Sequence, residues 1–235
     1  MVDEAFLRTS LIIGEDNLNK LHTKCVWVFG CGGVGSFTVE ALCRAGVGNI
    51  CVVDMDNVDK TNINRQLIAL NSTVGESKVS VMEKRCRDIN PNVNFTPIKK
   101  MFSKDTLNEF DFSDADYIVD AIDMVSSKLL LVEMANELNI PIISSMGTGN
   151  KLDATKICVS DVYSTQGDAL ARVMRHELKK RGIEKLKVVY SPEKAIEQKI
   201  CEEGKTRPIT ASVPWVPSVA GLVIAGEVVK DMLQY

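Results

Sequence analysis

Short apolar runs alternate with longer stretches of helical periodicity through the first two thirds of the chain. The apolar runs predict strands at 25–30, 49–54, 93–98, 116–123 and 140–145, and the intervening stretches predict helices near 33–46, 76–89, 103–110 and 126–139. The first two runs are continuously apolar, as in strands that are covered on both faces. This alternation predicts an α/β fold with a doubly wound, mostly parallel sheet.

The pattern changes after Gly149. Two further apolar runs predict strands at 156–161 and 187–191, with a basic helix at 168–181 between them. The stretch 191–213 is rich in charge and proline, and we interpret it as a mobile loop or crossover. The second part of the chain therefore reads as a mixed-strand extension of the sheet.

A last apolar segment predicts a closing helix at about 217–232 that packs back on the sheet. We expect a single domain over 1–235, in which a first part at about 20–150 is followed by a second part at about 151–235. The closing segment is interrupted by Glu227, Lys230 and Asp231, so it lacks the unbroken run of about 18 apolar residues that a membrane span needs. No membrane span is expected.

Composition narrows the class of protein. With 235 residues, 45% hydrophobic and 25% charged, the chain is typical of an ordinary globular protein. Its seven cysteines form no C-x-x-C pair, which argues against a tetrahedral zinc site and for a reducing, cytoplasmic compartment. The net charge of −3 argues against a surface devoted to nucleic acid, yet 172–187 carries seven Lys or Arg against Glu177 and Glu184.

A glycine-rich turn follows the first predicted strand. Gly30, Gly32 and Gly35 have the G-x-G-x-x-G spacing at the head of a helix, where the backbone can approach a phosphate closely. Asp54 lies 19 residues beyond Gly35, at the end of the second strand, where a carboxylate can bind ribose hydroxyls. The alternative is a turn that serves packing alone. The motif indicates a Rossmann-like nucleotide site but does not distinguish NAD, FAD and ATP.

The next segment favours ATP. Asn62, Arg65 and Gln66 lie close together, and Lys78 stands at the head of the following helix. Preorganised cations stabilise the negative charge that gathers when the α-phosphate of ATP is attacked, whereas a dehydrogenase has no evident use for them. The alternative is that Arg65 and Lys78 belong to a solvated, ion-paired face.

Several short motifs together resemble one family. The chain contains G-x-G-G-V-G-S, D-x-D, T-N-x-N-R-Q, V-G-x-x-K, I-N-P and D-A-I-D in order. This combination, over about 5–160, resembles the ubiquitin-activating-type ATP-dependent adenylating enzymes, which include activators of sulfur-carrier proteins. The resemblance implies that the domain adenylates a carboxylate, using ATP and Mg²⁺.

The resemblance also implies roles for particular residues. Asp54 would bind the ribose, Asn62, Arg65 and Lys78 the phosphates, and Asp123 would hold Mg²⁺, unless Asp123 is only a helix N-cap. The full implied ATP-binding set is Gly30, Gly32, Gly33, Gly35, Asp54, Asp56, Asn62, Arg65, Gln66 and Lys78. Arg8 matches the region from which an arginine of the partner subunit reaches the triphosphate, which implies a homodimer.

The second half resembles one branch of that family, the tRNA threonylcarbamoyladenosine dehydratases. The resemblance lies in "QGDALARVMRHELKKRGIEKLKVVYSPE" and "SVPWVPSVAGLVIAGEVVKD". It implies that the substrate is tRNA carrying threonylcarbamoyladenosine, that the part at 151–235 faces it, and that a sulfur-relay protein is an open further partner. The cations of the basic segment, Arg172, Arg175, Lys179, Lys180 and Arg181, would then contact tRNA phosphates rather than form a solvated helix face.

Three other hypotheses stay open on the sequence. An activator of a ubiquitin-like or sulfur-carrier protein would use Cys201 as a transferable thiol, although its acidic neighbours do not favour a reactive thiolate. An NAD- or FAD-dependent oxidoreductase would fit the glycine motif but not Arg65 and Lys78. A non-catalytic binding module has no chemical reason to keep Asp54, Arg65, Lys78 and Asp123 together.

Overall fold

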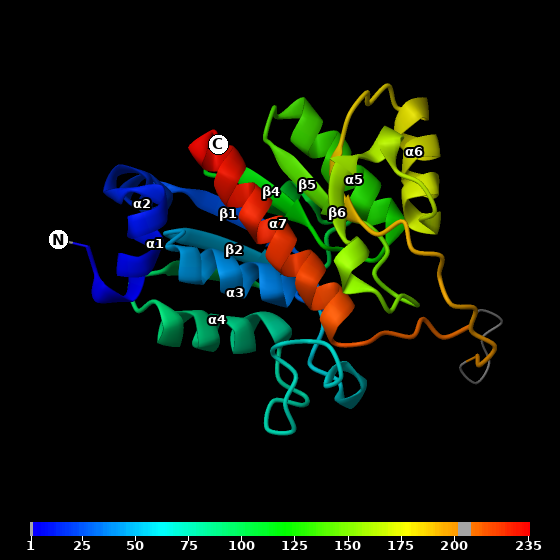
Figure 1. The fold of residues 1–235 in the computed structure, drawn as a ribbon, viewed down its shortest axis with the longest axis horizontal. Coiled ribbons are helices and arrows are strands. Elements are labelled where there is room, and N and C mark those ends of the chain that lie inside the picture. Colours follow the sequence, from blue (N-terminus) through cyan, green and yellow to red (C-terminus); the bar gives the residue numbers. More distant parts are fainter. Residues whose placement is uncertain (1, 202–207) are drawn as a thin grey trace.

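The computed structural model describes residues 2–201 and 208–235, and its centre is a seven-stranded sheet (Figure 1). The strands are β1 (Cys25–Phe29), β2 (Asn49–Val53), β3 (Asn94–Ile98), β4 (Tyr117–Asp120), β5 (Ile142–Ser145), β6 (Cys158–Asp161) and β7 (Lys187–Tyr190). Their order is β3-β2-β1-β4-β5-β7-β6, and every neighbouring pair is parallel except β6 and β7. The predicted doubly wound, mostly parallel sheet with a mixed C-terminal extension is confirmed.

Helices cover both faces of this sheet. They are α1 (Leu7–Ile13), α2 (Glu15–Thr23), α3 (Gly35–Ala45), α4 (Lys78–Ile89), α5 (Val125–Glu137), α6 (Ala169–Lys180) and α7 (Trp215–Leu233). One core joins β1 and β2 to α3, α4 and α7, and another joins α5 and α6 to β7. Figure 1 shows the closing helix α7 running diagonally across the sheet beside α3, as the sequence predicts. Within the described residues, no helix is both long enough and apolar enough to cross a membrane.

The predicted helix at 103–110 is wrong. Only a 3-10 turn, Leu107–Glu109, forms there, and the rest of the segment is irregular. Phe102, Phe110 and Phe112 pack as a cluster against Trp27 and Phe29 of β1. The segment therefore covers the sheet with aromatic side chains instead of a helix face.

Two elements at the N-terminus were not predicted. Helix α2 buries only Leu18 and Leu21, and α1 leaves Leu11 and Ile12 exposed, so neither gives a long amphipathic repeat.

The segment predicted as a loop or crossover is irregular where the structure describes it. The described part of 191–213 contains no regular element beyond a single bridge between Cys201 and Pro208. The remainder of that predicted loop lies outside the described residues.

Candidate functional site

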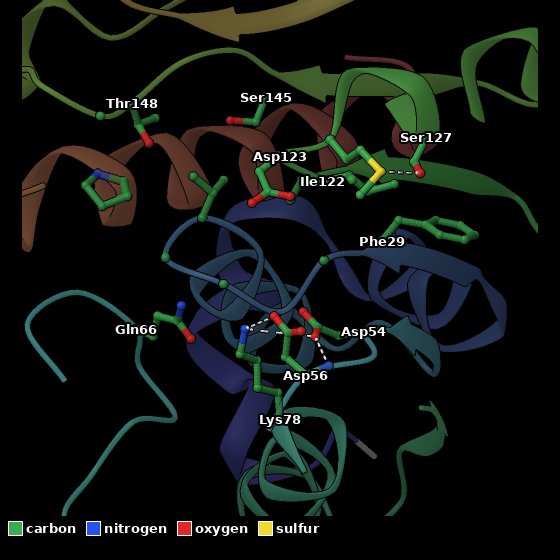
Figure 2. A pocket seen from close by; sticks show the side chains of 18 of the residues that line it. Phe29, Asp54, Asp56, Gln66, Lys78, Ile122, Asp123, Ser127, Ser145 and Thr148 are labelled. Atoms are coloured by element: carbon green, nitrogen blue, oxygen red, sulfur yellow. Dashed lines mark hydrogen bonds and ion pairs between the residues drawn. The ribbon is translucent and has the colours of Figure 1, made fainter. Parts of the chain in front are cut away.

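A cavity of about 680 Å³ opens at the carboxyl ends of the parallel strands. The ends of β1, β2, β4 and β5 line it through Phe29, Asp54, Ile122 and Ser145 (Figure 2). The strand order reverses at β1, which has β2 on one side and β4 on the other. In open α/β sheets this is the position at which ligands bind.

The glycine-rich turn forms one wall of the cavity. Gly30 has a φ of +91°, and a Cβ there would lie 2.6 Å from the carbonyl oxygen of Ala121. A Cβ on Gly35, the first residue of α3, would lie 1.8 Å from the carbonyl oxygen of Gly30. The turn therefore excludes side chains at both positions, and it brings the N-terminus of α3, with its free N–H groups, up to the cavity.

Asp54 and Lys78 form the charged floor of the cavity. The Asp54 carboxylate accepts hydrogen bonds from the backbone N–H groups of Cys31 (2.7 Å) and Asp56 (2.8 Å). Burial raises the pKa of Asp54 above its usual range. Lys78 is buried, and its Nζ lies 2.8 Å from Asp56 Oδ2 and 4.0 Å from Asp54 Oδ1 (Figure 2). The cavity thus holds a fixed cation beside a carboxylate whose ionisation is costly.

The segment before α4 adds further polar groups. Arg65 lines the cavity, and its guanidinium donates to the carbonyl oxygen of Thr61 and to Asn64 Oδ1, both at 2.9 Å. Gln66 also lines it, and its buried Oε1 has no hydrogen-bond partner among the described residues. Asn62 does not line the cavity; its Oδ1 accepts from the N–H of Asp59 in a capping box. The structure therefore gives Asn62 a role in shaping the turn that carries Arg65 and Gln66.

Asp123 lies at the cavity end of the D-A-I-D motif. Its side chain is exposed and lines the cavity just after β4 (Figure 2). The N-cap of α5 is Met124, which makes no side-chain capping bond, so the alternative of Asp123 as a helix cap is wrong. A carboxylate in this position is the oxygen ligand that Mg²⁺ prefers beside phosphate, so the donor present fits that ion.

A buried ion pair that the sequence analysis did not predict holds the D-A-I-D motif in place from the interior of the protein. Lys128 Nζ lies 2.9 Å from Asp120 Oδ2, and both side chains are fully buried. Lys128 also donates to the carbonyl oxygen of Ile122, at 3.0 Å, while Ser144 donates to Asp120. These bonds fix the backbone from which Asp123 projects. The only signal in the sequence was a lysine inside an apolar helix face.

A second missed ion pair lies at the opposite wall. Lys151 and Asp168 are both buried, and Asp168 caps α6 by accepting from the N–H of Ala171. Lys151 also binds the carbonyl oxygen of Gly147, which lines the cavity. The pair therefore connects the cavity wall to the start of the basic helix.

The predicted basic surface is smaller in the fold than in the sequence. The Arg175 guanidinium turns inward and donates to the carbonyl oxygen of Thr165, at 2.9 Å. Lys180 and Arg181 both bind Glu177, and Arg181 also lies 2.7 Å from Glu133. Arg172 and Lys179 are exposed, and their side chains make no ion pair or hydrogen bond within residues 2–201 and 208–235. These two carry the free charge of α6.

Arg8 is placed away from this cavity. It is exposed on α1 and is not among the residues that line the cavity of its own chain. Leu11 and Ile12, close to it on the same helix, are 78% and 85% exposed. Arg8 therefore does not reach the cavity of its own chain, and its exposed side chain could serve only the cavity of another subunit.

The fold and the cavity define a nucleotide-binding protein of the doubly wound α/β class. The model of the ThiF family matches residues 6–235, and the chain belongs to this family. A Bacillus subtilis protein named tRNA threonylcarbamoyladenosine dehydratase is 42% identical over 240 residues, which span 97% of this chain and 94% of that protein.

Solved structures give the same result. An Escherichia coli tRNA N6-threonylcarbamoyladenosine dehydratase, TcdA, in complex with ATP has a TM-score of 0.89 at 31% identity, covering 100% of this chain and 97% of that one. The AMP complex of TcdA also has a TM-score of 0.89, at 30% identity and with the same coverage. The similarity therefore extends over the whole fold and includes relatives that hold adenine nucleotides.

Proposed function

We propose that this protein is an ATP-dependent enzyme that cyclises threonylcarbamoyladenosine beside the anticodon of tRNA, with net loss of water. The observation that carries the proposal is the 42% identity to the Bacillus subtilis dehydratase over nearly the whole of both chains. The cavity supports it, because Asp54, Lys78, Arg65 and Asp123 converge there from separate elements.

The geometry suits the first chemical step. The carboxylate of the threonylcarbamoyl group attacks the α-phosphorus of ATP, and pyrophosphate leaves. Asp54 accepts hydrogen bonds from the ribose hydroxyls, while Lys78 and Arg65 stabilise the negative charge on the phosphates. Asp123 would hold Mg²⁺, which when bound neutralises phosphate charge. Gln66 supplies a buried oxygen that has no partner among the described residues and can accept a hydrogen bond from the nucleotide.

The second step needs no protein thiol. A nucleophile within the same modified base displaces AMP from the acyl adenylate, and the ring closes. The oxygen lost as water leaves with AMP. These two steps account for every bond formed and broken without Cys201 or a sulfur-relay partner. The assay therefore contains no such partner.

Helix α6 is the best candidate for the tRNA contact. Leu170, in its first turn, lines the cavity, and the exposed Arg172 follows it closely in the chain. Lys179 lies about 10 Å further along the helix axis. These two cations can neutralise tRNA phosphates next to the mouth of the cavity, which positions the modified base without reading sequence.

We further infer a homodimer in which Arg8 of one chain serves the cavity of the other. The exposed apolar surface of α1 beside Arg8 supports this inference, because such side chains are normally covered. Mixing inactive Arg8→Ala and Arg65→Ala chains is expected to restore activity, since some dimers then contain one complete site. No recovery on mixing would refute the shared site.

The decisive experiment analyses tRNA nucleosides by mass spectrometry after incubation with ATP and Mg²⁺. We expect the threonylcarbamoyladenosine mass to fall by one water, with AMP and pyrophosphate formed only when the tRNA carries the modification. Arg65→Ala protein is the negative control. Equal AMP production with unmodified tRNA would refute the substrate, and a Cys201-dependent thioester with a carrier protein would favour the protein-activating alternative.

A further inference from the structure

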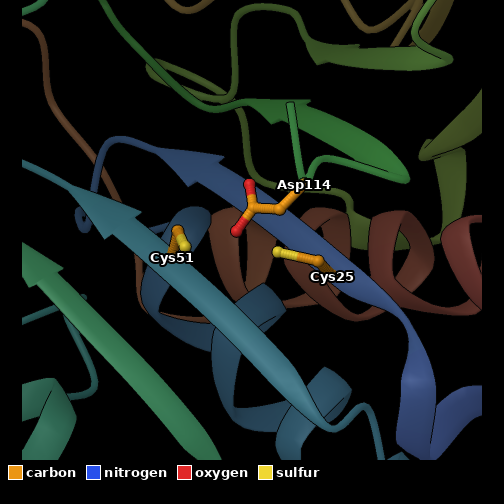
Figure 3. Close-up of side chains that lie close together, drawn as sticks. All are labelled: Cys25, Cys51 and Asp114. Atoms are coloured by element: carbon orange, nitrogen blue, oxygen red, sulfur yellow. The ribbon is translucent and has the colours of Figure 1, made fainter. Parts of the chain in front are cut away.

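Two cysteines and an aspartate that are far apart in the sequence meet at the end of β1 remote from the cavity (Figure 3). Cys25 opens β1, Cys51 lies in β2, and Asp114 belongs to the loop before β4. Their sulfur and carboxylate oxygen atoms all lie within 4.8 Å of one another. Within residues 2–201 and 208–235 this is the one group of three or more potential metal ligands so arranged.

We propose that Cys25, Cys51 and Asp114 bind a thiophilic divalent cation of the Zn²⁺ type. Zinc–sulfur and zinc–oxygen bonds of about 2.3 and 2.0 Å place neighbouring ligand atoms of a tetrahedron about 3.5–3.8 Å apart. The observed separations are at most 4.8 Å, so each pair of ligand atoms must approach by no more than about 1.3 Å to close the site. The two thiol protons pass to the solvent when the ion binds.

The surroundings hold the carboxylate in place. Trp27 Nε1 donates to Asp114 Oδ1 at 2.9 Å, which leaves the other carboxylate oxygen for the ion. Asp116, in the same loop, accepts from the backbone N–H of Cys25 at 2.8 Å and pairs with Lys24. A hydrogen-bonded carboxylate ligand is the arrangement that metal sites commonly use.

Exposure of the three side chains suits entry and a fourth ligand. Cys25 and Cys51 are each 5% exposed, whereas Asp114 is exposed at the surface. An ion can therefore arrive from the solvent side and keep one water. Figure 3 shows the Asp114 carboxylate beside the side chains of the two cysteines, at the strands that carry them. The absence of C-x-x-C pairs argued against a zinc site, but it does not bear on this one, because the three ligands come from separate segments of the chain.

The site is separate from the nucleotide cavity. Cys25 and Phe29 are the two ends of β1, and four strand residues of about 3.3 Å each put roughly 13 Å between Cys25 and the cavity end. A bound ion would tie the loop before β4 to β1 and β2. Its role is structural, and it does not depend on the proposed reaction.

The test titrates the full chain with Cd²⁺ and follows the ultraviolet charge-transfer band of thiolate-bound Cd²⁺, then displaces it with Zn²⁺. All proteins carry Cys201→Ser, which removes the exposed thiol. We expect one thiolate-bound ion per chain. Carboxylates in the nucleotide cavity give no such band, so an ion held there is not counted.

Variants decide the assignment. Cys25→Ser and Cys51→Ser are each expected to abolish the band, and Trp27→Phe to weaken Zn²⁺ affinity about tenfold by releasing Asp114. Asp114→Asn changes one carboxylate oxygen of an exposed side chain and keeps an oxygen that can accept from Trp27 Nε1, so a loss of affinity is not due to unfolding. The matched control is Cys43→Ser. Cys43 and Cys86 form a second pair of buried free cysteines, and Cys43 Sγ lies 3.4 Å from the carbonyl oxygen of Cys86.

Three results would overturn the proposal. The first is the absence of a thiolate band in the parent protein at Cd²⁺ concentrations that saturate a reference two-cysteine peptide. The second is a band that survives Cys25→Ser or Asp114→Asn with unchanged affinity, and the third is a band that disappears in Cys43→Ser. Circular dichroism of each variant accompanies the titration to show that the fold is retained.

Discussion

Lys151 Nζ lies 2.6 Å from Asp168 Oδ2 and donates to the carbonyl oxygens of Gly147 (2.7 Å) and Ser191 (2.8 Å). One ammonium group thus joins the cavity wall, the cap of α6 and the segment after β7. The side chains of Lys151 and Asp168 are 3% and 2% exposed. Their ion pair therefore lies in a medium where an uncompensated charge is costly.

Asp168→Asn is expected to lower the free energy of unfolding by about 3–5 kcal/mol, because it leaves the Lys151 cation buried without its partner. Asparagine still caps a helix well, so the loss of the cap adds little. Denaturant unfolding measures the change. Lys156→Met, which breaks the exposed Lys156–Asp153 pair, is the control and should change the free energy of unfolding very little, because water screens this pair. Similar small effects of both substitutions would contradict this prediction.

Lys128→Met should destabilise the protein by a similar amount, about 3–5 kcal/mol, by leaving Asp120 charged and fully buried. The double variant Lys128→Met with Asp120→Asn removes both charges and should recover part of the loss. Thermal and denaturant unfolding of the two proteins test this. A double variant less stable than the single one would show that the pair is not the source of the effect.

Arg65→Ala is expected to reduce the turnover of adenylation about 10²–10³-fold, because its charge meets negative charge that develops in the transition state. Lys78→Ala should act in the same direction. The KM for ATP should change much less than kcat, as measured by pyrophosphate release. Lys84→Ala is the matched control for Lys78→Ala, since Lys84 lies on α4, the helix that begins at Lys78, with its side chain 71% exposed. A loss confined to ATP affinity would mean that Arg65 only binds the ground state.

Glu177→Gln is expected to tighten tRNA binding and to steepen its dependence on salt by about one unit of slope. Hydrogen bonds from Lys180 and then Arg181 lower the pKa of Glu177 to about 2, so this carboxylate neutralises them at neutral pH. Its stabilising contribution is present above about pH 4.3, the unfolded value, and is lost only as the pH falls toward 2.

Filter binding at several salt concentrations measures the effect of Glu177→Gln. Glu184→Gln makes the same change in net charge at an exposed residue of the same segment and serves as the control. Equal gains in the two variants would show that net charge, rather than release of Lys180 and Arg181, is responsible. In the unmodified protein, lowering the pH from 7 to 5 should leave this carboxylate ionised.

The sequence predicted what local pattern encodes. The seven strands follow from the apolar runs, and the positions of the glycine turn and Asp54 follow from the ends of the parallel strands. The family resemblance implied that Lys78, Arg65 and Asp123 serve the same site, and all three line the cavity. The predicted contact of Asn62 with phosphate stays a prediction, since its side chain is engaged in a turn.

What the sequence could not predict depends on contacts between distant segments. Lys128 pairs with Asp120, and Lys151 meets carbonyl groups from two other segments, with no spacing rule to reveal either. The helix predicted at 103–110 failed for a related reason, because burial of Phe102 and Phe110 against β1 outweighs a weak local preference. The inward turn of Arg175 likewise appears only in the fold.

The glycine turn separates two kinds of evolutionary constraint. Gly30 and Gly35 are required by the chain itself, because any Cβ there would collide with backbone. At Gly32 the nearest atom to an added Cβ is the amide nitrogen of Gln66, 3.8 Å away, so the fold would accept alanine. Selection for glycine at position 32 would therefore come from the bound nucleotide and not from folding. A relative that no longer binds ATP would tolerate substitution of Gly32 but would still need Gly30 and Gly35. Loss of Gly32 alone therefore offers a way to recognise family members that have lost nucleotide binding.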